Sequence, residues 1–159
     1  MTAATGSEDH GPMPSPQELA GLLPFLSVAE VENLLPYLAV RHLAAGEVLM
    51  QEGDPAECMG FLMSGRLAVK KQTSFEGRYI LVAVIEPGGL VGELAVVEKG
   101  RRTATVAAME ESRLLVLPHE GMNRLLAEDN PLAVKLFQRI IHVLGHRLRG
   151  ASERLARIL

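Results

Sequence analysis

The sequence contains one cysteine, Cys58, among its 159 residues. A single thiol cannot form a disulfide within the chain, and it cannot supply the several cysteines of a thiolate zinc site or an iron–sulfur cluster. The formal net charge is only -3, so no overall positive field attracts a phosphate backbone. Nucleic acid binding would therefore require a dedicated module.

Long hydrophobic runs are also missing. An apolar run such as Tyr79 to Ile85 is far too short to span a bilayer. The first residues, MTAATGSEDHGPMPSP, lack the basic and apolar regions of a signal peptide. We therefore expect a cytoplasmic protein without a membrane partner.

The five histidines are not arranged as a metal site. Only His142 and His146 share a helical face, four residues apart, and no third ligand lies near them in sequence. Cys58 has no adjacent histidine that would activate it as a nucleophile. We expect no metal, no prosthetic group and no enzymatic activity.

The remaining composition indicates one globular domain, because 48% of the residues are hydrophobic. Residues 1–14 are polar and rich in glycine and proline, which predicts a disordered tail before a domain at 15–159. The stretches SPQE from Ser15 and SVAE from Ser27 are capping boxes, which predict two short helices.

Short apolar runs separated by glycine-containing turns extend from Val40 to Leu117 and predict an antiparallel sandwich or barrel. The segment from Glu93 to Glu98 interrupts this pattern and predicts one or two helical turns. The expected strands are 40–43, 47–51, 59–63, 66–72, 78–85, 103–109 and 113–117.

Helical periodicity returns after Pro118, with a short helix expected at 122–127 and a long one at 131–159. Asn130 is the expected N-cap of the long helix and Pro131 its first residue. Its apolar stripe has coiled-coil spacing and favours a homodimer, although the stripe could instead pack on the chain's own core. The stripe consists of Phe137, Ile141, Leu144, Leu148, Ala151, Leu155 and Ile158.

The stretch VGELAVVEKGRRTATV, residues 91–106, places charges in an otherwise apolar segment. Gly92 opens the expected short helix, whose first amides suit an anion. Arg102 can donate two parallel hydrogen bonds to a phosphate, and Glu93 can accept from hydroxyls, so this loop could hold a ribose phosphate. Alternatively, Glu93 and Arg102 pair with each other across the turn.

This stretch resembles the phosphate-binding cassette of cyclic nucleotide-binding domains, the family of the bacterial catabolite activator and the kinase regulatory subunits. The resemblance continues into AAGEVLMQEGDPAECMGFLMSGRLAV, residues 44–69, and covers roughly residues 17–159. The residues that match the cassette without a gap are Gly92, Glu93, Leu94, Ala95, Arg102, Ala104, Thr105 and Val106.

The resemblance implies a mainly β fold, an eight-stranded antiparallel β-roll with N-terminal helices and a long C-terminal helix that covers the base and pairs two subunits. It implies that Glu93 accepts the ribose 2'-hydroxyl, that Arg102 neutralises the cyclic phosphate, and that amides near Ala95 and Thr103 complete the anion site. The implied ligand-binding residues are Gly92, Glu93, Leu94, Ala95, Arg102, Thr103, Ala104 and Ser152.

Three departures from the family pattern bear on the ligand. Arg101 stands where many members have proline, and we expect it to point to solvent. Thr103 stands where cyclic AMP receptors commonly carry alanine or serine and cyclic GMP-dependent kinases carry threonine. Ala151 and Ser152 match a threonine and serine that touch adenine in the catabolite activator, so the threonine is lost. We expect cyclic AMP ahead of cyclic GMP.

The C-terminal helix is basic, which we interpret as the solvated flank of the dimer seam. The catabolite activator continues into a DNA-binding domain, whereas this sequence ends at Leu159. We therefore expect a receptor without its own DNA-binding or catalytic domain, which signals to an unknown protein. The alternatives are a degenerate β-roll that dimerises without ligand, and a fragment of a catabolite-activator-like transcription factor.

Overall fold

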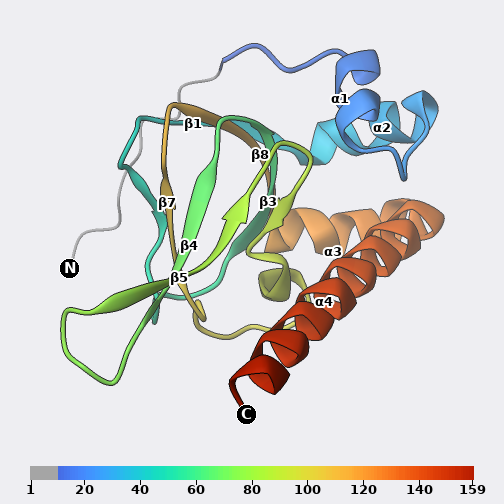
Figure 1. The fold of residues 1–159 in the computed structure, drawn as a ribbon. Helices are drawn as coiled ribbons and strands as arrows, with labels where there is room; N and C mark the ends of the chain where they lie inside the picture. The colour runs from blue at the N-terminus through green and yellow to red at the C-terminus, as the bar shows by residue number, and fades with distance from the viewer. Residues whose placement is uncertain (1–10) are drawn as a thin grey trace.

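Eight strands form two antiparallel four-stranded sheets in the computed structural model, which describes residues 11–159 (Figure 1). The first sheet has the order β1 (Ala39–Leu43), β8 (Ser112–Pro118), β3 (Cys58–Ser64) and β6 (Leu90–Val91). The second has the order β2 (Val48–Met50), β7 (Thr105–Ala108), β4 (Leu67–Gln72) and β5 (Tyr79–Ile85). The predicted eight-stranded β-roll is confirmed.

Helices cover one side and one end of the roll (Figure 1). The N-terminal helices are α1 (Pro16–Leu22), α2 (Val28–Leu34) and the 3-10 turn η1 (Leu35–Tyr37). A second 3-10 turn, η2 (Glu93–Val96), lies between β6 and β7, and α3 (His119–Glu128) and α4 (Asn130–Ile158) end the chain. None of the helices among the described residues is long and apolar enough to cross a membrane. Residues 1–10 of the tail expected at 1–14 lie outside the described residues.

The first sheet is buried on both faces because it lies between the helices and the second sheet. Phe61 on β3 and Leu115 on β8 pack with the helices, whereas their neighbours Leu62 and Leu114 pack between the sheets. Adjacent residues of a strand point to opposite faces, so two buried faces require a continuous apolar run. The outer strand β5 is instead exposed over most of its length.

The predicted strands are observed with ends shifted by one or two residues, and the helical turn expected at 93–98 is observed as η2. Strand β6 was not predicted from the apolar runs, because two residues between Gly89 and Gly92 give no periodicity. Helix α3 is longer than predicted. The N-cap prediction for α4 was wrong: Asp129, rather than Asn130, accepts a hydrogen bond from the Leu132 amide at 3.3 Å.

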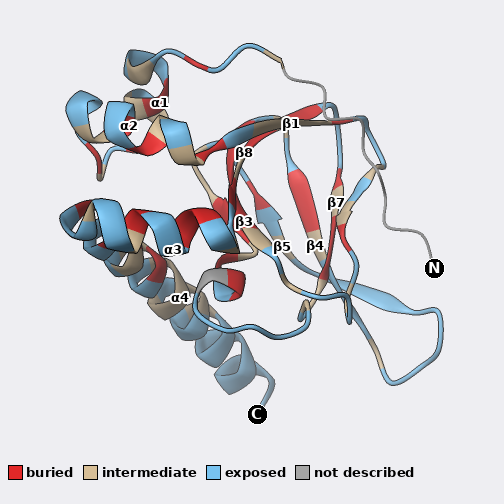
Figure 2. Ribbon diagram, turned by 180° about the vertical axis from the view of Figure 1, so that it is seen from behind, coloured by how far each residue is buried: buried red, intermediate tan, exposed pale blue. Residues whose placement is uncertain are grey.

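Helix α4 has two apolar faces rather than one. Its buried face consists of Leu132, Ala133, Leu136 and Ile140 and packs on the core. The predicted stripe divides: Phe137 and Leu144 are partly buried against that core, whereas Ile141, Leu148, Leu155 and Ile158 are exposed. Figure 2 shows the C-terminal half of α4 exposed. The dimer stays a prediction, and the exposed half of the stripe is the surface that it would use.

Candidate functional site

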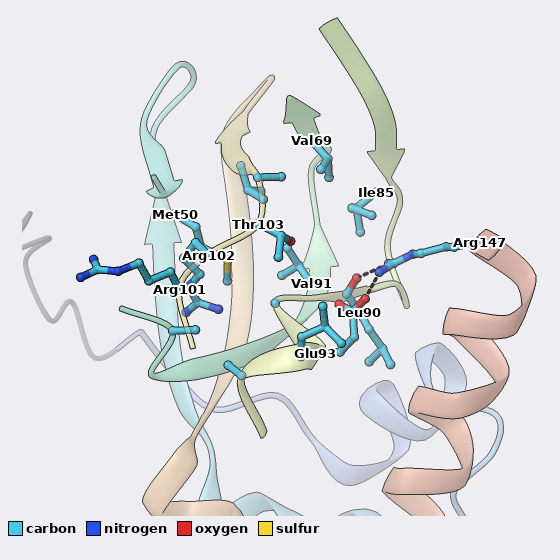
Figure 3. Close-up of a pocket in the computed structure, with 16 residues that line it drawn as sticks. Met50, Val69, Ile85, Leu90, Val91, Glu93, Arg101, Arg102, Thr103 and Arg147 are labelled. Carbon is cyan, nitrogen blue, oxygen red and sulfur yellow. Dashed lines mark hydrogen bonds and ion pairs between the residues drawn. The ribbon is translucent and has the colours of Figure 1, made fainter. Parts of the chain in front are cut away.

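A pocket lies between the 91–106 segment, the inner faces of the sheets and α4, with about 530 Å³ of space when its open mouth is included (Figure 3). Its walls are mostly apolar, and its polar side chains include Glu93, Arg102, Thr103 and Arg147. Pockets that bind small molecules combine apolar walls with a few polar groups in this way. Of the eight predicted residues, seven line it, namely Gly92, Glu93, Leu94, Ala95, Arg102, Thr103 and Ala104.

Gly92 makes the turn that opens η2. Its φ of 68° lies in the left-handed region, and a Cβ there would lie 2.5 Å from the Met50 methyl carbon and 2.7 Å from Arg102 Nη1. Only glycine fits such a position without strain. Within this turn the Ala95 amide donates to the Gly92 carbonyl at 3.1 Å, and the role of the amides near Ala95 and Thr103 in an anion site stays a prediction.

The backbone of Arg102 is fixed by the turn that follows β2. Its amide donates to the Asp54 carbonyl at 2.7 Å, and its carbonyl accepts from the Gly53 amide at 2.9 Å. The guanidinium Nη2 lies 3.5 Å from Cys58 Sγ, and sulfur is a weak acceptor. Within residues 11–159, no carboxylate pairs with Arg102. The guanidinium therefore keeps strong donors for an anion in the pocket.

Arg101 and Arg102 differ in direction. Arg101 also borders the pocket, but its side chain is exposed, donates to the Gly53 carbonyl at 2.8 Å and extends away from Glu93 and Arg147 in Figure 3. This agrees with the expectation that it faces solvent. Of the two neighbouring arginines, Arg102 is therefore the one whose guanidinium lies beside the Gly92 turn.

Glu93 is buried, with 6% of its surface exposed, and its partner is Arg147 on α4. Arg147 Nη1 donates to the Glu93 carboxylate, and Nη2 donates to the Leu90 carbonyl at 2.7 Å. The alternative in which Glu93 pairs with Arg102 is therefore wrong. The carboxylate has a second oxygen and further lone pairs, so it can still accept from a hydroxyl in the pocket.

Arg147 is the site residue that the sequence analysis missed. We interpreted the basic residues of α4 as a solvated flank, which is wrong for Arg147 because it reaches into the pocket (Figure 3). A signal was available in the spacing. Leu136, Ile140 and Val143 lie on one apolar face of α4, and Arg147 is the next residue on that face, four positions after Val143. Because this face is buried, a charged residue on it needs a partner inside the protein.

The other end of the segment is tied to the second sheet. Lys71 on β4 donates to the Thr103 carbonyl, and the Thr105 hydroxyl accepts from the Glu52 amide at 3.0 Å. Ser152, in contrast, is exposed on α4 and does not line the pocket. The position of Ser152 within one chain therefore does not support its predicted contact with the base.

The chain belongs to the family of cyclic nucleotide-binding domains. The family model, described as the cyclic nucleotide-binding domain, matches residues 40–129, which include β1 to β8 and the whole 91–106 segment. The family identified from the cassette is therefore confirmed.

The chain is similar to several curated proteins. It is 31% identical over 117 residues to a candidate potassium channel protein of Rhodopseudomonas palustris, covering 74% of this chain and 28% of that protein. It is 23% identical to a CRP-like cAMP-activated global transcriptional regulator of Mycobacterium tuberculosis, covering 88% and 60% respectively. It thus spans less than two thirds of these relatives.

Experimental structures share the fold. A cyclic nucleotide-binding domain from Methylobacillus flagellatus has a TM-score of 0.82 at 21% identity, covering 91% of this chain and 86% of that one. The catabolite activator protein of Thermus thermophilus has a TM-score of 0.72 at 27% identity, covering 84% and 60%. These likenesses support the β-roll with its flanking helices.

Proposed function

We propose that this chain is a receptor for a cyclic mononucleotide, cyclic AMP ahead of cyclic GMP, that binds without catalysis. Arg102 neutralises the cyclic phosphate, Glu93 accepts the ribose 2'-hydroxyl, and the base lies towards α4. The observation that carries this proposal is an arginine that pairs with no carboxylate among residues 11–159 and lines one apolar pocket together with a buried glutamate. The relatives named for cyclic AMP favour that ligand.

We further propose that the ligand acts through α4 in a homodimer. Arg147 already joins α4 to Glu93, so a ligand that contacts Glu93 changes the free energy of α4 docking on the roll. The exposed residues Ile141, Leu148 and Leu155 repeat every seven positions, which suits a two-fold helix pair. The receiver of the signal is a further protein, recognised through α4.

Calorimetry with cyclic AMP, cyclic GMP and cyclic di-GMP tests the ligand. We expect Arg102→Leu to weaken binding about tenfold to a hundredfold, because a hydrogen bond to a charged group contributes roughly 1.5–3 kcal/mol. Arg101→Leu is the matched control. The Arg101 side chain borders the pocket, but its guanidinium points outward and donates to the Gly53 carbonyl, so this variant should change the affinity for nucleotide much less.

The opposite ranking of the two arginines would overturn the placement of the phosphate. Absence of binding by all three nucleotides would favour the degenerate β-roll that dimerises without ligand. Hydrogen exchange of residues 131–158 measures the effect on α4, and identical exchange with and without saturating nucleotide would contradict the proposed signalling.

A further inference from the structure

Two side chains from the C-terminal helices hold the η2 turn. Arg147 on α4 contacts Glu93 at the start of the turn. His119, the first residue of α3, places Nδ1 3.1 Å from the carbonyl oxygen of Ala95. A carbonyl oxygen can only accept, so Nδ1 carries the hydrogen in this contact. The turn is thus joined to α3 and α4 by different bonds.

The two bonds differ in their relation to the pocket. Glu93 is a pocket-lining carboxylate that a bound ribose would share with Arg147. His119 does not line the pocket, and its bond is made to the backbone of the turn. A ligand in the pocket therefore competes with the first bond and leaves the second one unchanged.

His119 is itself held in place by the roll. Its amide donates to the Glu57 carbonyl at 2.8 Å, immediately before Cys58, whose sulfur lies beside Arg102. Its side chain is partly buried, whereas the next residue, Glu120, is exposed. The imidazole thus projects from a fixed backbone position at the start of α3 towards the η2 turn.

We propose that His119 is a positioning residue that couples the η2 turn to α3 and α4. Through the bond from Nδ1 to Ala95, the helices follow the turn when a ligand takes part of the Glu93 carboxylate from Arg147. The response of α4 to ligand rests on the proposed receptor function, whereas the tethering of η2 does not depend on any ligand.

The test compares His119→Phe, which keeps a ring and removes the donor, with His119→Asn, whose amide nitrogen lies at the same distance from Cβ as Nδ1. Glu120→Gln is the control. The readouts are hydrogen exchange of the Ala95, Val97 and Glu98 amides, which are bonded within the turn, and the cyclic AMP-induced protection of residues 131–158. All variants are measured on the full chain, together with their affinities for cyclic AMP.

We expect His119→Phe to speed exchange of the three turn amides about twofold to tenfold without nucleotide, the range given by one net hydrogen bond. It should also lose at least half of the ligand-induced protection of α4, and His119→Asn should restore both. The Glu120→Gln variant should match the wild type in every readout.

Three results would overturn the assignment. The first is that the turn amides of His119→Phe exchange at the wild-type rate, and the second is that His119→Phe and His119→Asn show equal defects in exchange and in the protection of α4. The third is that His119→Phe loses more than about a hundredfold in affinity for cyclic AMP, which would make His119 part of the pocket itself. If the wild type binds no nucleotide, the proposed function fails. The exchange of the turn amides without nucleotide then still decides whether His119 holds the turn.

Discussion

Replacing Arg147 with methionine tests whether α4 is fastened to the roll through the Glu93 carboxylate. Methionine keeps the unbranched stem of the side chain and removes both donated hydrogen bonds, to Glu93 and to the Leu90 carbonyl. The Glu93 side chain is only 7% exposed, so in the Arg147→Met variant its carboxylate is left without an ion-pair partner in a buried position. The same substitution at Arg149, which is exposed two residues further along α4, is the control.

The magnitude follows from the burial of the two partners. Removing one partner of a fully buried pair costs about 3–5 kcal/mol. Arg147 is 36% exposed, so part of its attraction is screened by solvent and we expect a smaller loss, about 1.5–3 kcal/mol. Urea unfolding measures this loss, and Arg149→Met should stay within about 0.5 kcal/mol of the wild type.

A double-mutant cycle with Glu93→Gln separates the pair from other effects of the methionine. We expect a coupling free energy of about 1–2 kcal/mol between positions 93 and 147. Equal stability of the Arg147→Met and Arg149→Met variants, or a coupling below about 0.3 kcal/mol, would refute the conclusion that this ion pair docks α4.

Two further predictions concern α4. Leu148→Glu should weaken the predicted dimer in analytical ultracentrifugation without lowering the unfolding midpoint of the monomer, because Leu148 is 69% exposed in one chain. His142→Glu is the control, since His142 lies off the stripe, and it should leave the dimer unchanged. A dimer that neither substitution changes would exclude the stripe as the interface. Glu30→Gln should cost up to about 1 kcal/mol at neutral pH, because Lys135 Nζ lies 2.7 Å from the Glu30 carboxylate and lowers its pKa. This stabilisation is present above the pKa of the unfolded carboxyl, about 4.3, and is lost as the pH falls through the lower pKa of the folded state. The free energies of unfolding of the wild type and the variant should therefore converge at acid pH. A difference in stability that stays constant with pH would contradict this prediction.

The sequence predicts the elements of this fold well where a local pattern specifies them. The capping-box patterns at Ser15 and Ser27 predict the starts of α1 and α2, and both serine hydroxyls accept from the amide three residues on. The reciprocal bond from the N-cap amide to the glutamate side chain is observed at Ser27. Strand β6 is absent from the prediction because its two residues pair with β3 through the fold and have no pattern of their own. The N-cap of α4 was misplaced by one residue because Asp129 and Asn130 are both good caps.

The site was predictable to the extent that it is contiguous in the chain. Glu93 and Arg102 lie nine residues apart in one segment, and both line the pocket. Arg147 lies 54 residues from Glu93, so its contact depends on how far α4 is rotated about its axis. That rotation is set by the buried face around Leu136 and Ile140, whereas the seven-residue stripe lies on the neighbouring, largely exposed side of the helix.

The two halves of the pocket are attached to different parts of the molecule, and for the proposed receptor this division predicts which ligands change α4. Arg102 is fixed to the turn after β2 through Gly53 and Asp54, whereas the η2 turn with Glu93 is fixed to the C-terminal helices. An anion that contacts only Arg102 occupies the half that has no bond to α4. A ligand that also offers a hydroxyl to Glu93 bridges both halves and changes the partner of Arg147. A ligand shifts an equilibrium only by its differential contacts with the two states. For the proposed receptor, we therefore expect the sugar hydroxyl rather than the phosphate to supply the contact that reaches α4.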